Sequence, residues 1–156
     1  MRLEPLYRVR FAYPESYGVT LEGDRGSEAH YWFLAEGTVE GRIEGRMRAV
    51  NHPRARVDGC ALPRVEGAYT TTDGATVMFE MRGYARPYPA ERRQIVVSVR
   101  HTAEDERFRW LNDVIAVGTG EIRPREAGAG GPRKVHGHAV DFVIDVAELV
   151  WEPVAP

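Results

Sequence analysis

Glu66 and His101 are the two residues whose types and predicted positions suit proton transfer in an apolar cavity. Glu66 belongs to an alternating stretch, and the register expected for the turn that follows places it on the same face as Val77 and Phe79. A carboxyl group among apolar side chains has a raised pKa because burial disfavours its charged form, so it suits acid–base catalysis near neutral pH. A histidine ordinarily titrates near neutrality, so His101 could carry the same proton. The sequence therefore predicts Glu66 and His101 as catalytic residues.

Each of these residues also has a simpler interpretation. Glu66 could lie near the rim of a barrel, solvated or paired with an arginine, because glutamates at strand ends usually stay in water. His101 is near the end of an expected strand and could be an ordinary surface residue. Both alternatives stay open at this point.

A larger set of residues has side chains typical of a ligand pocket. The alternation turns hydroxyl, amide and aromatic groups toward an apolar interior, which is the composition of most small-molecule sites. The alternative is that the tyrosines fill the interior, since barrels of about eight strands are often solid inside. The predicted ligand-binding residues are Tyr7, Tyr13, Tyr31, Asn51, Thr70, Phe79, Met81 and Trp110, with Trp110 expected to cap or plug one end.

No cofactor and no metal site are expected. Lys134, the only lysine, lies in a Gly-rich loop, which makes Schiff-base chemistry on a desolvated lysine improbable. His136 and His138 share this loop, without a nearby cysteine or a carboxylate at a spacing typical of metal sites. Cys60 follows a glycine in a loop and has no base beside it in the sequence, which indicates a non-catalytic thiol.

The strand expected over residues 42–51 shows which faces are inside. Its one face carries Ile43, Met47 and Ala49, and its other face carries three arginines and a glutamate. Unpaired charge is too costly to bury, so the charged face must be outside and the apolar face inside. The same rule then orients the other strands.

A β-hairpin is expected at residues 65–84, with Asp73-Gly74 as a two-residue turn. Asp-Gly between alternating segments is a strong hairpin signal because both central residues of the turn need positive φ. This turn places Thr70 opposite Val77 and Glu66 opposite Met81, and so predicts that Glu66 points inward.

Alternation with a period of two recurs along the chain, and no window has a convincing helical period. Strands of this kind could form a sandwich or a barrel, and their length and the lack of helices to cover sheet edges favour closure. The sequence predicts an all-β protein: one antiparallel β-barrel domain over residues 1–156, with little helix. The expected strands are 3–13, 30–40, 42–51, 65–72, 75–84, 94–102, 114–122 and 140–151.

Composition narrows the possible environments and partners. The net charge of −2 argues against a nucleic-acid partner. No apolar run is long enough for a membrane helix, and the first residues lack the apolar core of a signal peptide. A single cysteine excludes an intrachain disulfide framework. We therefore expect a cytoplasmic protein with no membrane partner.

Several short motifs occur in an order that is similar to a known family. They are LEPL (3–6), EGTVEG (36–41), YT (69–70), DGA (73–75), RG (82–83), WLN (110–112) and DV (145–146). Together they resemble the mostly uncharacterised domain of unknown function 3237 family. The resemblance implies a closed calycin-like or allene-oxide-cyclase-like barrel that often self-associates. It supplies no established catalytic residue.

These observations predict a barrel that handles a small apolar or aromatic molecule. One hypothesis is a cofactor-independent acid–base enzyme, an isomerase, cyclase or lyase. The alternatives are a non-catalytic ligand-binding protein and an oligomer-forming structural barrel with a filled interior. The outward-facing Trp32 and Leu34 suggest an association surface, and a homo-oligomer, a dimer or larger, is expected.

Overall fold

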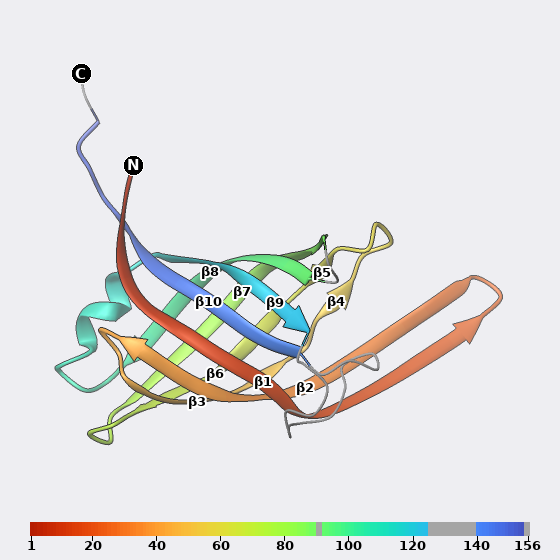
Figure 1. Ribbon diagram of the computed structural model, residues 1–156, viewed down its shortest axis with the longest axis horizontal. Coiled ribbons are helices and arrows are strands. Elements are labelled where there is room, and N and C mark those ends of the chain that lie inside the picture. Colours follow the sequence, from red (N-terminus) through yellow and green to blue (C-terminus); the bar gives the residue numbers. More distant parts are fainter. Residues whose placement is uncertain (90–91, 125–139, 155–156) are drawn as a thin grey trace.

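The computed structural model describes residues 1–89, 92–124 and 140–154, which form ten β-strands and one short 3₁₀ helix (Figure 1). In chain order these are β1 (Arg2–Gly23), β2 (Gly26–Gly41), β3 (Gly45–Asn51), β4 (Arg54–Ala55), β5 (Ala61–Leu62), β6 (Arg64–Thr71), β7 (Thr76–Tyr88), β8 (Arg92–Ala103), η1 (Arg109–Asp113), β9 (Ala116–Pro124) and β10 (Val140–Val150). No helix among the described residues is long and apolar enough to cross a membrane.

Eight of these strands close into a ring. Their order is β1, β2, β3, β6, β7, β8, β9 and β10, and β10 pairs again with β1; every pair is antiparallel. The prediction of an antiparallel β-barrel is thus confirmed. The helix η1 lies at one end, and the short strands β4 and β5 lie at the other (Figure 1). These two short strands fall between the expected strands 42–51 and 65–72, where the sequence predicted no strand.

The inside and outside of the barrel follow the alternation expected from the sequence. On β3, Met47, Ala49 and Asn51 are buried, while Arg46 and Arg48 are exposed. The centre of the barrel is filled by side chains that are at most 1% exposed, among them Val9, Val39, Met47, Met81, Val99 and Ile144. Among the described residues the lumen is therefore packed at its centre.

The hairpin of β6 and β7 has a different turn from the predicted one. Thr71 and Ala75 close it, because the Thr71 N–H donates to the Ala75 carbonyl over 2.9 Å, and three residues lie between them. Gly74 takes a φ of +89°, which favours glycine, and the Thr71 hydroxyl accepts from the Ala75 N–H at 2.8 Å. The turn is thus one residue longer than Asp73-Gly74 alone.

That extra residue shifts the pairing of β6 with β7. Glu66 lies opposite Glu80, and Val65 lies opposite Met81. Since side chains alternate with a period of two, a shift of one residue turns every side chain of a strand to the other face. The predicted inward positions of Glu66 and Thr70 are therefore wrong: both are exposed on the outside, and Val65 and Tyr69 are inside.

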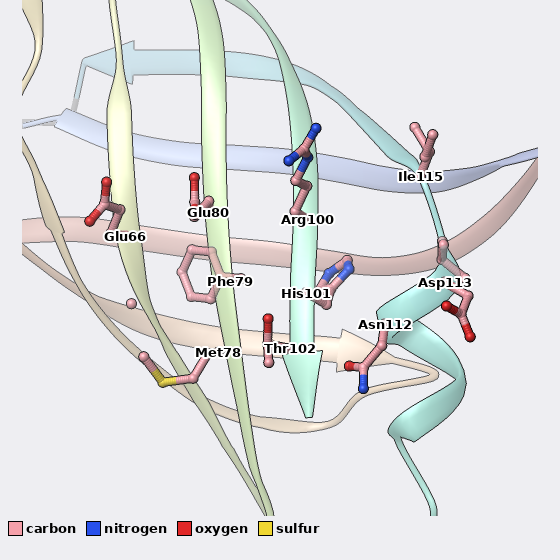
Figure 2. A pocket seen from close by; sticks show the side chains of 12 residues that line it. Glu66, Met78, Phe79, Glu80, Arg100, His101, Thr102, Asn112, Asp113 and Ile115 are labelled. Carbon is pink, nitrogen blue, oxygen red and sulfur yellow. The ribbon is translucent and has the colours of Figure 1, made fainter. Parts of the chain in front are cut away.

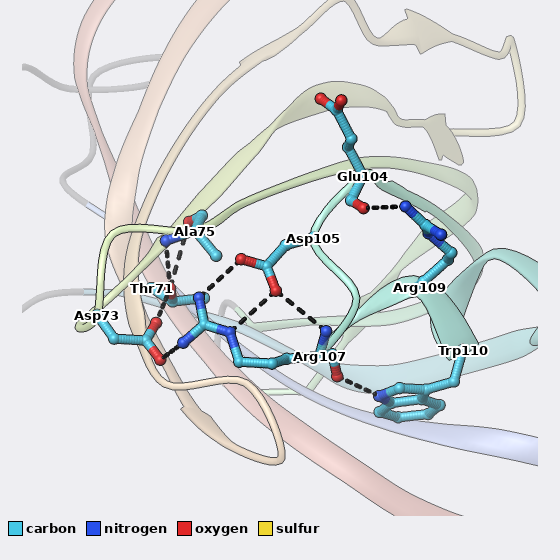
Figure 3. Close-up of polar contacts among 8 residues, drawn as sticks. All are labelled: Thr71, Asp73, Ala75, Glu104, Asp105, Arg107, Arg109 and Trp110. Carbon is cyan, nitrogen blue, oxygen red and sulfur yellow. Dashed lines mark hydrogen bonds and ion pairs between the residues drawn. The ribbon is translucent and has the colours of Figure 1, made fainter.

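The segment before η1 is tied to this turn by Arg107 (Figure 3). The Arg107 guanidinium forms an ion pair with Asp73 and donates to both carboxylate oxygens of Asp105, at 2.9 and 2.7 Å. These bonds lower the pKa of Asp105 to about 2. Trp110 donates from its indole N–H to the Arg107 carbonyl at 3.1 Å. The end of the barrel at η1 is thus held by a polar network on its surface.

Strands β1 and β2 continue beyond the barrel as a two-stranded arm, residues 15–23 and 26–32 (Figure 1). The pairing of β1 with β10 ends at Ala12, and that of β2 with β3 begins at Phe33. Farther out, β1 and β2 pair only with each other among the described strands. The sequence predicted strands at 3–13 and 30–40, so residues 15–23 and 26–29 of the arm were missed.

Candidate functional site

An apolar cavity of about 600 Å³ opens at the β4–β5 end of the barrel. Its wall combines inward-facing residues from the strand ends with residues of the β3–β6 connection. Its aromatic and polar lining includes Tyr13, Phe33, Asn51, Arg93 and Phe142, and Cys60, Ala61, Ala85, Ile95 and Ile122 form most of the remaining apolar wall. We call this space the mouth cavity.

Aromatic rings form one side of the mouth cavity. The rings of Tyr13 and Phe33 are stacked, with centroids 4.7 Å apart and an interplanar angle of 14°. Phe142 lies against Tyr13 at 4.7 Å in a tilted arrangement, and it stacks on Phe11 at 4.4 Å. Such a wall offers flat apolar surface to a ring-shaped or alkyl ligand.

One polar pair lies on this wall. The Asn51 side-chain Nδ2 donates to the Tyr13 hydroxyl at 2.6 Å, and the Asn51 Oδ1 accepts the backbone N–H of Arg64 at 3.0 Å. The amide is therefore held from both sides. Burial raises the pKa of Tyr13, so the hydroxyl is neutral at physiological pH. Because the Tyr13 oxygen accepts from Asn51, its own proton is left to donate, and the described residues present no acceptor for it.

A second buried polar cluster lies at the other end of the interior. The Tyr7 hydroxyl is 2.6 Å from Nε2 of His101, and the Tyr69 hydroxyl donates to that of Tyr7 at a longer distance of 3.4 Å. Burial lowers the pKa of His101 to about 4 and raises the pKa of Tyr7. His101 is therefore a neutral imidazole at pH 7, and its Nδ1 is buried without a hydrogen-bond partner among the described residues.

A groove on the outside of the barrel lies beside this cluster (Figure 2). Charged and polar side chains of β6, β7 and β8, among them Glu66, Glu80 and Arg100, border it together with the last residues of η1 and the two residues that follow. Phe79 and His101 also contribute to its wall, but their side chains are only 3% and 5% exposed. The groove is thus an outer surface feature, and the imidazole belongs to the interior.

The predicted catalytic pair is not formed. Glu66 lies on the outside, with its carboxylate 2.9 Å from Nε of Arg64 and 3.7 Å from Nη2 of Arg82, whereas His101 is inside. Glu66 is therefore a solvated carboxylate paired with arginines, which is the simpler of the two interpretations of this residue. The physical reason is the three-residue turn, which reverses the face of β6 on which position 66 falls.

The predicted ligand-binding residues separate into groups. Tyr13 and Asn51 meet in the mouth cavity, whereas Tyr7 pairs with His101 in the other cluster. Tyr31 is half-buried and stacks on Phe33 at 6.0 Å. Phe79 and Met81 are core residues, and Phe79 stacks on Tyr69 at 4.2 Å.

Two other predicted residues lie elsewhere. Thr70 is exposed outside the barrel, for the reason given for Glu66. Trp110 lies on η1, where the Arg42 guanidinium stacks 3.9 Å from its ring centroid; this is the end opposite to the mouth cavity. Its predicted place at an end of the barrel is correct, but it does not line the cavity.

Phe33, Phe142 and Arg93 were missed as residues of the site. The alternation did put Phe33 and Phe142 on inward faces, but it carries no signal of which inward residues share an end of the barrel. Lys134, His136 and His138 lie outside the described residues. Within residues 1–89, 92–124 and 140–154, no three His, Cys, Asp or Glu side chains are placed to hold a metal ion.

The fold and the cavity define a closed antiparallel β-barrel that is packed at its centre and open at one apolar mouth. Residues 1–146 match the family described as "Protein of unknown function (DUF3237)", and the chain belongs to this family. This confirms the resemblance found in the sequence motifs. No functionally curated protein matches the chain.

Three solved structures have a similar fold. A beta-barrel like protein from Acinetobacter baumannii AYE is 17% identical with a TM-score of 0.71, over 94% of each chain. A conserved protein of unknown function from Rhodopseudomonas palustris is 17% identical with a TM-score of 0.68, over 96% of this chain and 97% of that one. A protein with unknown function from Clostridium acetobutylicum ATCC 824 is 14% identical with a TM-score of 0.73, over 96% and 100%.

Proposed function

We propose that this protein binds a small, largely apolar or aromatic molecule in the mouth cavity and does so without catalysis. The observation that supports this most directly is an apolar space of about 600 Å³ with one ordered polar pair, Tyr13 and Asn51. Small-molecule sites have this size and this composition. The Tyr13 hydroxyl would donate to an oxygen of the ligand and so fix its orientation.

The chemistry of the lining favours binding over acid–base catalysis. Its described residues include no histidine and no carboxylate. Tyr13, with its raised pKa, is a hydrogen-bond donor and a poor base, and the Cys60 thiol is buried with a contact to the Ala61 carbonyl. An isomerase, cyclase or lyase at this place would have to rely on the Tyr13 proton.

The test is a fluorescence titration with prodan, a neutral naphthalene that carries a carbonyl group. We expect saturable binding with a blue-shifted emission, because the probe moves from water into an apolar cavity. Ala61→Trp, which fills the cavity from its wall, should abolish the signal. Ala147→Trp adds the same side chain on the outer face of β10 and should leave binding intact. Equal binding to both variants, or none to the native protein, would rule the proposal out.

The Tyr13 hydroxyl can be tested with the same probe. Tyr13→Phe removes the donor but keeps the ring, and we expect the affinity for prodan to fall about fivefold, which corresponds to the loss of about 1 kcal/mol. Naphthalene, which has no acceptor, should bind both proteins equally. A parallel loss of both ligands would point to a change in the shape of the cavity instead.

We further propose that the arm pairs with the arm of a second copy of this chain. An isolated two-stranded hairpin is marginal in water, and Val19 and Leu21 of the arm are 62% and 60% exposed on one face. Charged residues and prolines commonly protect an edge strand against pairing with another chain. Residues 16 to 21, on the outer edge of β1, include neither a charged residue nor a proline.

Self-pairing of this edge is compatible with its charges. In an antiparallel pair with a two-fold axis at Val19, Leu21 of one copy lies opposite Tyr17 of the other, and Glu22 lies opposite Ser16. No two acidic residues oppose each other, and Tyr17, Val19 and Leu21 of the two copies form one apolar patch across the two paired β1 strands. A dimer with this geometry would give the homo-oligomer expected from the sequence.

Light scattering coupled to size-exclusion chromatography tests the dimer. Leu21→Lys should convert a dimer into a monomer, because it puts a charge into the shared face. Met78→Lys is the matched control, since Met78 is a 52% exposed apolar residue on the outer face of the barrel. A monomeric native protein, or a dimer that survives Leu21→Lys, would contradict the proposed interface.

A further inference from the structure

An arginine lies on the inward side of the mouth cavity. Arg93 precedes Ile95 by two residues on β8, and Ile95, Val97 and Val99 all point into the barrel. Alternation therefore directs Arg93 to the same side, and it lines the mouth cavity. Its Nη1 donates to the Gly59 carbonyl at 3.2 Å, which holds the side chain over the opening.

The positive charge of Arg93 has no counterpart in the lining of the cavity. Arg56 also lines it, but Asp58 neutralises Arg56 by a bond of 3.1 Å to Nε and a second contact to the guanidinium. The described lining contains no carboxylate, and no acidic residue among the described ones forms an ion pair with Arg93. By contrast, its exposed neighbour Arg92 lies 3.6 Å from Glu121.

We propose that the ligand of the mouth cavity is an apolar carboxylic acid whose carboxylate pairs with Arg93. This inference rests on the proposed binding function and specifies its ligand class. The planar guanidinium matches a carboxylate with two parallel hydrogen bonds, and apolar surroundings strengthen the attraction because they screen charge poorly. The body of the ligand lies along the stacked rings of Tyr13 and Phe33.

Isothermal titration with 2-naphthoate and its neutral analogue 2-naphthamide at pH 7.5 tests this class. The native protein should bind 2-naphthoate at least ~10-fold more tightly than 2-naphthamide, since hydrogen bonds between charged groups are about twice as strong as neutral ones. Arg93→Gln should remove that preference by lowering the affinity for 2-naphthoate to about that for 2-naphthamide. Arg92→Gln, which removes an equal charge outside the cavity, should change neither affinity.

A second variant separates loss of charge from loss of fold. Arg93→Lys keeps the charge without the planar fork, and it should retain part of the preference for 2-naphthoate. Equal affinities of the native protein for both ligands, or an unchanged preference in Arg93→Gln, would overturn the assignment of a carboxylate while binding in the cavity stands. If neither 2-naphthoate nor 2-naphthamide binds the native protein, the ligand class and the proposed function both fail.

Discussion

The hydroxyl of Tyr7 lies 2.6 Å from Nε2 of His101, and both side chains are buried although 94 residues separate them in the sequence. Tyr7 comes from β1 and His101 from β8, strands that are not neighbours in the ring. The bond therefore spans the interior and satisfies two polar groups that are buried away from the protein surface. Within the part of the chain that the structure describes, the remaining nitrogen, Nδ1, has no hydrogen-bond partner.

Tyr7→Phe should destabilise the barrel by about 1–3 kcal/mol, because it leaves Nε2 of His101 buried and unsatisfied. Urea unfolding followed by circular dichroism measures this change. Tyr69→Phe is the matched control: its hydroxyl makes only the 3.4 Å contact, so we expect a smaller loss. A larger effect of Tyr69→Phe would show that the Tyr7–His101 bond is not the stronger one.

The buried imidazole should make stability depend on pH in a mildly acidic window. The pKa of His101 is about 4 in the folded protein and about 6.5 when unfolded, so between these values the unfolded chain binds a proton that the folded one does not. The free energy of unfolding should thus be highest above pH 6.5 and fall by up to about 3 kcal/mol as the pH drops to 4.

Unfolding midpoints between pH 7 and pH 5 test this dependence, because carboxylates with lowered pKa values, such as Asp105, titrate below that range. The quantity to compare between the native protein and His101→Gln is the slope of the unfolding midpoint against pH, and not the absolute stability. We expect the slope to decrease in the variant. An identical slope in both proteins would mean that the histidine does not resist protonation.

Gly37→Ala should be strongly destabilising, by about 3 kcal/mol or more. A Cβ at position 37 would lie 1.9 Å from the Arg10 carbonyl oxygen and 2.7 Å from the Cα of Phe11, so β1 and β2 would have to separate. Gly23→Ala is the control at the tip of the arm, where a Cβ would meet no atom within 4 Å. Thermal unfolding of the two variants should differ clearly, and similar midpoints would contradict the close approach of the strands.

Glu66→Gln should leave ligand binding in the mouth cavity unchanged. The carboxylate is on the outside and 48% exposed, and such surface ion pairs contribute less than about 1 kcal/mol to stability. Prodan affinity and urea unfolding check both expectations. A loss of affinity of tenfold or more would place Glu66 in the cavity and would mean that β6 and β7 pair in the predicted register, with Glu66 opposite Met81.

The hairpin shows why sequence alone misplaced part of the site. Asp73-Gly74 marked the turn correctly, but the length of the turn depends on Thr71, whose hydroxyl accepts from the backbone of Ala75. Alternation defines two faces of a strand and not their register with the next strand. An error of one residue was enough to move Glu66 from the expected interior to the surface.

The sequence by itself determined the class of fold and most of the inward faces, because both follow from a local pattern. A strand such as β3 needs only its own row of arginines to show which side meets water. The tertiary structure alone decided which residues meet: Tyr13 with Asn51, Tyr7 with His101, and Arg93 with the apolar mouth. These encounters depend on the closure of the ring and on strand register, which arise from contacts between residues far apart in the chain.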